Sequence, residues 1–314
     1  MAEKDVAEKI LLSYNDVFAD LVNVLLFDGE RVIAPDELED QAPRSYYKTA
    51  GEIHEIERDV VKRWTKEDVR LVCIGLENQT DPDPDMPLRV IGYDGASYRS
   101  QLSGRDRYPV ITMVLYFGYE HRWKRNLTLK NRLRIPRKFD KYINDYKMNL
   151  FEIAYLEEEQ VNLFQSDFRI VADYFVQKRK NHSYVPSPIE FQHVQETLQL
   201  LSIMAGDQRF EPKLFITRKG GPKNMCEVLD QIENRGYEKG VQKGIQKGIQ
   251  IGSLNKEKEM VRNFYAAGSS EEYIAKAMKL DLALVKDWIT HPTEEAFCSV
   301  KPRPKRGEHK TPRQ

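Results

Sequence analysis

Apolar residues recur every three or four positions from Val6 to Phe27, which is the spacing of an amphipathic helix. Residues 28–50 have no clear period and contain two prolines and many acidic residues, so we expect a connecting loop there. Two β-prone runs follow, Glu52 to Trp64 and Val69 to Asn78, on either side of a short polar segment. This arrangement predicts an antiparallel hairpin.

The second strand of this hairpin is apolar on both faces as far as Leu76, so we expect it in the middle of a covered sheet. Asp85 is the expected N-cap, with Pro87 in the first turn, of a helix that continues towards Leu102. The apolar run YPVITMVLYF, from Tyr108 to Phe117, predicts another buried strand. The order of helix, two strands, helix and strand indicates a mixed α/β fold.

Three aspartates alternate with other residues after the second strand, at Asp81, Asp83 and Asp85. Their spacing is that of the opening of a calcium loop, but the sixth position is Met86 rather than Gly and the twelfth is Gly92 rather than Glu. We therefore interpret this run as a loop that ends a strand and caps a helix.

Other carboxylates end the strand itself. Glu77 and Gln79 are two positions apart, so on a strand they point to the same face, and Asp59 lies near them on the partner strand. Two carboxylates this close repel each other unless a cation resolves the repulsion, and Mg²⁺ is the natural candidate. A structural network is the alternative, in which the acids pair with Arg58, Arg63 or Arg70.

Composition limits the protein class only weakly. The chain has 314 residues, of which 40% are hydrophobic, enough for one good-sized core and a second unit. Lys+Arg and Asp+Glu each number 49, so net charge indicates no partner. The three cysteines have no CxxC spacing, which argues against a disulfide framework or a zinc site. No apolar run approaches the length of a membrane span and no signal peptide is recognisable, so we expect a cytoplasmic protein with no membrane partner.

Four stretches together resemble the recombination-promoting nuclease (Rpn) family, a transposase-like branch of the PD-(D/E)xK nuclease superfamily. They are ERDVVKRW with Asp59, GLENQT with Glu77 and Gln79, DPDMPLRVIGY, and YPVITMVLYFG. The resemblance implies a restriction-endonuclease-like core of a helix, a strand hairpin, a helix and another strand. This order agrees with the one indicated by the hydrophobic pattern.

The resemblance also implies a chemistry. It makes Asp59 and Glu77 ligands of Mg²⁺ or Mn²⁺, and it puts Gln79 where the superfamily usually has a catalytic lysine. A neutral amide orients groups by hydrogen bonds but supplies no charge. The implied activity is that of a metal-dependent endodeoxyribonuclease, which hydrolyses phosphodiester bonds. The alternative is a catalytically inactive DNA-binding or assembly protein derived from such a nuclease.

A basic segment follows the last core strand. Between Glu120 and Lys138 the chain has eight Lys or Arg residues and one acid, with Trp123 among them. Binding to a phosphate backbone needs such a patch, although a solvated loop has the same composition. Together with one residue of the preceding helix, the expected DNA contacts are Arg89, Arg122, Lys124, Arg125, Lys130 and Arg132.

Glycines repeat every fourth position further along, at Gly236, Gly240, Gly244, Gly248 and Gly252. On a helix they would line one stripe on which another backbone can approach closely, at a cost of roughly 1 kcal/mol per glycine. We interpret the segment as an arm for homo-oligomerisation, with a flexible linker as the alternative.

The expected domains follow from these features. Near the C-terminus, Ser269 with Glu272 predicts a capping box, and Asp281 caps a last helix. This last helix has one basic residue, Lys286, so a packing or dimer module is expected rather than a DNA-reading one. The predicted divisions are a nuclease core at 1–145, an α-rich extension at 146–225, the glycine-repeat arm at 226–253, a small helical module at 254–290 and a disordered basic tail at 291–314.

Overall fold

The computed structural model describes residues 11–41, 44–49, 52–57, 60–76, 82–105, 107–216 and 220–291. The chain forms two compact units, Met1–Asn234 and Arg235–Gln314. The division falls inside one long helix, α7 (Met225–Ala266).

The first unit contains a mixed sheet of five strands in the order β1-β4-β5-β6-β7. The strands are β1 (Leu38–Asp40), β4 (Val60–Trp64), β5 (Val69–Leu76), β6 (Val110–Tyr116) and β7 (Asn149–Glu152). β4 runs antiparallel to β1 and β5, whereas β6 runs parallel to both β5 and β7. The predicted antiparallel pairing across the polar segment is confirmed for β4 and β5, and β5 is the central strand.

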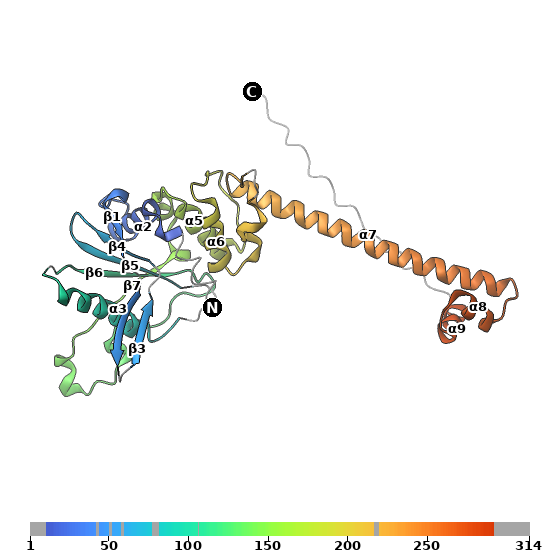
Figure 1. The fold of residues 1–314 in the computed structure, drawn as a ribbon, viewed down its shortest axis with the longest axis horizontal. Coiled ribbons are helices and arrows are strands. Elements are labelled where there is room, and N and C mark those ends of the chain that lie inside the picture. The colour runs from blue at the N-terminus through green and yellow to red at the C-terminus, as the bar shows by residue number, and fades with distance from the viewer. Residues whose placement is uncertain are drawn as a thin grey trace, which may run out of the picture. The chain divides into compact units, whose positions relative to one another are not determined.

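Helices cover both faces of this sheet (Figure 1). α2 (Asn15–Phe27) and α5 (Phe168–Asn181) lie on one side, and α3 (Met86–Ser100) lies on the other. Side chains of β5 alternate between these layers, with Leu71 and Cys73 packed in the core on the α2 and α5 side and Val72 in the core on the α3 side. Both faces of β5 are covered, which is why its sequence is apolar without alternation.

Residues 28–50, which were expected to form a loop, contain two strands. β1 pairs with β4 at the edge of the main sheet, and β2 (Arg44–Thr49) pairs antiparallel with β3 (Glu52–Glu57) in a separate two-stranded sheet. The predicted first strand of the hairpin is thus divided between β3 and β4. Strands this short show little period, and β1 is paired with β4, which is distant in the sequence.

A buried lysine joins β4 to α2. The side chain of Lys62 is 0% exposed, and its Nζ donates to Ser13 O at 2.5 Å, Asn15 Oδ1 at 2.6 Å and Asp40 Oδ1 at 2.5 Å. A buried ammonium is stable only when such acceptors replace its water. The three acceptors come from α2, the residues before it and β1, so Lys62 fixes these elements together.

The remaining elements of the first unit follow β6. β7 begins after residue 145, so the sheet continues into the region that was assigned to the α-rich extension. Two further helices are α4 (Glu158–Leu163) and α6 (Val194–Met204). Short 3-10 helices are η1 (Pro35–Glu37), η2 (Gln101–Ser103), η3 (Lys130–Arg132), η4 (Arg137–Tyr142), η5 (Ile153–Tyr155), η6 (Gln208–Phe210) and η7 (Pro212–Leu214).

In the second unit, the end of α7 packs with α8 (Glu271–Met278) and α9 (Leu282–Thr290) around a small core of Val261, Ile274, Ala275, Val285 and Trp288. The N-cap of α8 is Ser270, one residue after the predicted Ser269, and Asp281 caps α9 as expected. Since α7 is continuous through residue 253, the glycine repeat is helical. Within the described parts of the chain, no helix is long and apolar enough to cross a membrane.

Candidate functional site

The three parallel strands β5, β6 and β7 end at one side of the main sheet. The three parallel strands end in register, with Leu76 beside Tyr116 and Tyr116 beside Glu152. We call this the carboxyl edge. Glu77 and Gln79 follow β5 directly in the sequence and Asp59 directly precedes β4, but Asp59, Glu77 and Gln79 lie outside the described residues.

The arginines of the alternative ion-pair network lie at the other end of the hairpin. Arg63 pairs with Arg70 across β4 and β5, next to the turn at residues 65–68. Arg70 precedes the end of β5 by six residues, which is roughly 20 Å of strand. Arg63 Nε donates to Asp68 Oδ1 at 2.7 Å, and Arg70 Nη2 donates to Tyr108 Oη at 3.0 Å. These two arginines are therefore engaged by other partners. Arg58 lies outside the described residues.

Glu152 holds the start of the basic segment at the carboxyl edge. Its Oε1 accepts from Trp123 N at 2.7 Å, and its Oε2 lies 3.7 Å from Arg122 Nη1. The guanidinium groups of Arg122 and Arg179 both lie over the ring of Tyr155, at 4.6 and 4.8 Å from its centroid. Positive charge from the basic segment and from α5 therefore meets at this edge.

The structure engages four of the six predicted DNA contacts in ion pairs. Arg122 pairs with Glu152, Arg89 with Asp83 at 3.3 Å, Lys130 with Asp140 at 3.1 Å and Arg132 with Asp85 at 2.6 Å. Lys124 and Arg125 are exposed, and among the described residues neither has an acidic partner. Of the six predicted contacts, only Lys124 and Arg125 therefore keep a charge that no acid among the described residues offsets.

Asp83 and Asp85 form contacts within the fold, but the helix cap expected from the Asp85 side chain is not formed. Asp83 Oδ1 accepts from Asp85 N at 2.9 Å, and its other oxygen pairs with Arg89. Asp85 occupies the N-cap position of α3, but its carboxylate binds Arg132 instead of capping the helix. Arg89 Nη2 also donates to Tyr93 Oη at 3.1 Å. Asp81 lies outside the described residues.

Sequence reasoning missed a buried acid behind this surface. Asp94 of α3 is 2% exposed and accepts hydrogen bonds from Thr112 Oγ1 of β6 at 2.5 Å and from Tyr146 Oη. Burial and then the bond to Asp94 raise the pKa of Tyr146 far above its usual range. Asp94 lies one turn after the buried Val90, and an acid on the apolar face of a predicted helix is the signal that indicates such a network.

Tyr146 belongs to a long excursion between β6 and β7, residues 127–148, which we call the basic loop. Its two ends pair with each other, because Leu129 N donates to Tyr146 O at 2.9 Å and Met148 N donates to Leu127 O at 3.0 Å. Its middle contains η3 and η4. The Tyr146 side chain thereby attaches the base of the basic loop to α3.

A pocket of about 420 Å³ lies between α2, the loop after it and the segment before α5. Asp20 of α2 lines this pocket, and its carboxylate binds the backbone just before α5. Its Oδ2 accepts from Gln165 N at 2.9 Å and from Ser166 N at 2.8 Å. Asp16 of the same pocket pairs with His193 at 2.9 Å. These acids hold elements of the fold together.

Within the part of the chain that the structure describes, no three His, Cys, Asp or Glu side chains are grouped to hold a metal ion. The chain matches no family model, no curated protein and no solved structure.

Proposed function

We propose that the chain is a Mg²⁺-dependent DNA endonuclease of the recombination-promoting nuclease type, which hydrolyses phosphodiester bonds. The observation that carries this proposal is the carboxyl edge of β5, β6 and β7. The acidic segment follows β5 in the sequence, and the basic segment follows β6. The last residues of these two strands, Leu76 and Tyr116, lie side by side at the carboxyl edge. Ligands bind at this edge in open sheets with parallel strands.

The proposed site residues are Asp59, Glu77 and Gln79. The donor set fits a hard divalent cation, because Mg²⁺ and Mn²⁺ prefer carboxylate and amide oxygens. Asp59 and Glu77 would hold the ion, and Gln79 would orient the attacking water through its amide. When bound, the ion would lower the pKa of that water and offset charge on the phosphate.

Lys124 and Arg125 are the proposed contacts to the DNA backbone at this edge. Both are exposed and directly follow Trp123, which the bond from its backbone N–H to Glu152 holds in place. The acids paired with Arg89, Arg122, Lys130 and Arg132 weaken the attraction of those four residues for phosphate. They would contact DNA only by exchanging a carboxylate for a phosphate.

A second candidate function is a DNA-binding or assembly protein without nuclease activity. Gln79 favours it, because a neutral amide stands where the related nucleases usually have a lysine. The two candidates differ in one observable, since the second predicts DNA binding without cleavage in either Mg²⁺ or Mn²⁺.

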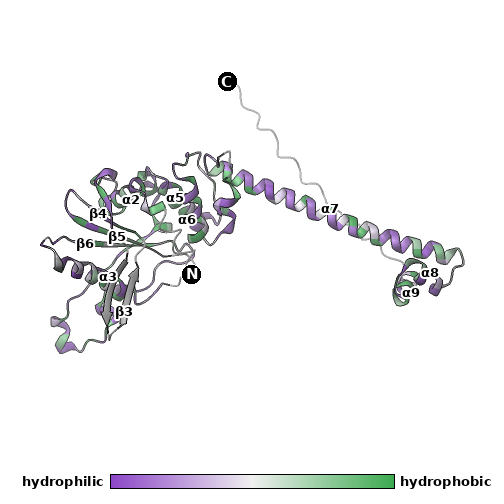
Figure 2. Cartoon of the chain, viewed as in Figure 1, coloured by the Kyte–Doolittle hydropathy of each residue, from purple (hydrophilic) through white to green (hydrophobic). Residues whose placement is uncertain are grey.

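Self-association through α7 is proposed with either function. The helix is mainly hydrophilic, with single apolar residues along it (Figure 2). Four exposed residues recur at every fourth position beside the glycines, and they are Tyr237, Val241, Ile245 and Ile249. A second copy of the helix is the occupant that this repeated stripe suits, because the same spacing is present on both partners.

Cleavage of supercoiled plasmid, with Mg²⁺ and with a chelator, tests the nuclease proposal. Asp59→Ala and Glu77→Ala should each lower the Mg²⁺-dependent rate by about a hundredfold or more, as for other groups that stabilise developing charge. DNA affinity and thermal unfolding should change little. Asp83→Ala is the matched control and should cleave nearly as fast as the parent. Equal rates for the parent and both ligand variants would refute the proposed site, and a parent that binds but does not cleave would leave the second candidate.

A further inference from the structure

The tip of the basic loop exposes two aromatic rings on one side of a short helix. Phe139 is 57% exposed and Tyr142 is 72% exposed, and both belong to η4 (Arg137–Tyr142). A 3-10 helix has three residues per turn, so residues three apart lie on the same side. The two rings therefore share one face of η4, and Lys138 and Lys141 share the next.

The tip is strongly basic after its internal ion pairs are formed. Residues 130–142 contain six Lys or Arg residues and one acid, Asp140. Asp140 pairs with Lys130, and Arg132 pairs with Asp85 of α3. The other four cations of the tip have no acidic partner within the described residues, and they are Arg134, Arg137, Lys138 and Lys141.

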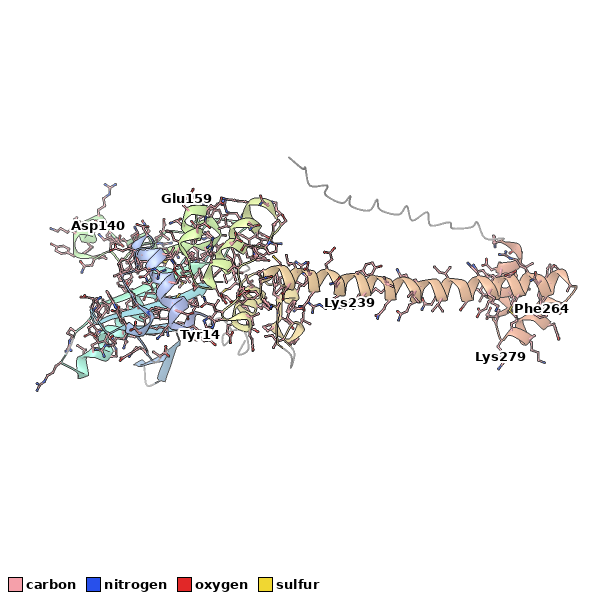
Figure 3. The ribbon with its side chains drawn as sticks, turned by 90° about the horizontal axis from the view of Figure 1, so that it is seen from above. Tyr14, Asp140, Glu159, Lys239, Phe264 and Lys279 are labelled. Atoms are coloured by element: carbon pink, nitrogen blue, oxygen red, sulfur yellow. The ribbon has the colours of Figure 1, made fainter. Side chains whose placement is uncertain are left out.

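The base of the basic loop is anchored to the rest of the unit. One backbone bond from Leu129 to Tyr146 and one from Met148 to Leu127 close the base, and the Tyr146 hydroxyl donates to Asp94. Asp140, labelled in Figure 3, lies on a projection beyond the packed side chains of the unit. Exposing two aromatic rings to water is unfavourable, so their presence on a basic, anchored projection indicates a binding surface.

We propose that the tip of the basic loop binds unpaired nucleotides of a DNA strand, with Phe139 and Tyr142 stacked on neighbouring bases and the four cations that lack an acidic partner on the phosphates. Lys141 Nζ also lies 4.8 Å from the centroid of the Tyr142 ring, so one cation accompanies that ring. This inference rests on the proposed function in taking DNA as the ligand and specifies single-stranded DNA as the form recognised. Aromatic rings beside basic side chains are the usual means of binding single strands.

The spacing of the rings favours a single strand over a duplex. Three residues of a 3-10 helix rise about 6 Å, because each residue adds about 2.0 Å. Bases in an intact duplex are stacked about 3.4 Å apart along each strand. Two rings attached to the helix about 6 Å apart along its axis suit bases that are already separated. An intact duplex leaves no open base faces for them.

Fluorescence anisotropy with the full chain and a chelator tests the inference, using a labelled single-stranded oligonucleotide and the same sequence as a duplex. Replacing both rings, by Phe139→Ala and Tyr142→Ala, should weaken single-strand binding about tenfold or more. Duplex affinity should change by less than about threefold, since the cations remain. Phe139→Tyr with Tyr142→Phe keeps both rings and should retain the affinity. Tyr273→Ala, which removes a ring that is 63% exposed on α8, is the matched control and should have no effect.

Three outcomes would overturn the inference. These are a parent that does not bind the single strand, an alanine pair that binds it as tightly as the parent, and an alanine pair that weakens both DNA forms equally. Phosphatidylserine vesicles provide a further arm, and ring-dependent binding to vesicles with unchanged DNA affinity would assign the tip to a membrane surface instead. If the variant with both alanines unfolds, Phe139→Leu with Tyr142→Leu also removes both rings and supplies the same comparison.

Plasmid cleavage in Mg²⁺ is measured separately from binding. Ring-dependent binding of the single strand without cleavage refutes only the nuclease proposal. Cleavage without ring-dependent binding refutes only the proposal that the tip binds single strands.

Discussion

Removing one hydroxyl from the base of the basic loop should destabilise the first unit. Tyr146→Phe deletes the donor to Asp94 but keeps the ring in the core on the α3 side. Asp94 then remains 2% exposed with one hydrogen-bond donor fewer. Water is unable to replace the lost donor without opening the contact between α3 and β6, so most of the bond's contribution should be lost.

The size of this effect follows from the charge of the acceptor. A hydrogen bond to a charged group contributes about 1.5–3 kcal/mol. For a unit the size of Met1–Asn234, each kcal/mol lowers the melting temperature by about 2–4 °C. We therefore expect Tyr146→Phe to lower the melting temperature by roughly 3–12 °C.

Thermal unfolding followed by circular dichroism and tryptophan fluorescence measures this loss. Trp123 is a useful reporter because it packs edge-on against Tyr116, with 5.4 Å between ring centroids, in the same core. Tyr142→Phe is the control, since its hydroxyl is on an exposed ring of the same loop and should matter by less than about 0.5 kcal/mol. If both variants melted within about 2 °C of the parent, the network would contribute no stability and the reasoning would be wrong.

Two other predictions concern the charged edge and the glycine stripe. Replacing Lys124 and Arg125 by Ala should weaken binding to unrelated duplex sequences about equally and lower the salt slope by about two, because each phosphate contact releases one counterion. Replacing Lys130 and Arg132, which already have acidic partners, is the control and should change the slope less. Changing the five glycines of α7 to Ala should raise helicity whether or not α7 self-associates. A Cβ at any of these glycines meets no other part of the described chain within 4 Å. Light scattering should show that the alanine variant has a lower oligomeric mass if a second copy of α7 packs against the glycines. An unchanged mass would contradict self-association through this stripe.

The local elements of the core were predictable because each has a strong pattern of its own. β5 is apolar at successive positions, and it is the central strand with both faces covered. α3 begins at the predicted residue, one after Asp85 and with Pro87 in its first turn. Periodicity and helix-start residues act over a few neighbours in the chain, so no tertiary information is needed to recognise them.

The edge strand β1 was not predictable in this way. It has three residues, and it is a strand because β4 supplies its hydrogen bonds. Such a short segment buries few side chains and carries no readable period. Its assignment depends on β4, whose paired residues lie more than twenty positions away in the sequence.

The sequence alone determined the predicted chemistry, because Asp59, Glu77 and the basic run are visible as residue types in order. Only the tertiary structure decided which charges are free, since Arg132 meets Asp85 and Arg122 meets Glu152 across long separations in the chain. The same holds for Asp94, whose partner Tyr146 is 52 residues away. Electrostatic attraction depends on distance in space, and a pattern of neighbours along the chain contains no information about that distance.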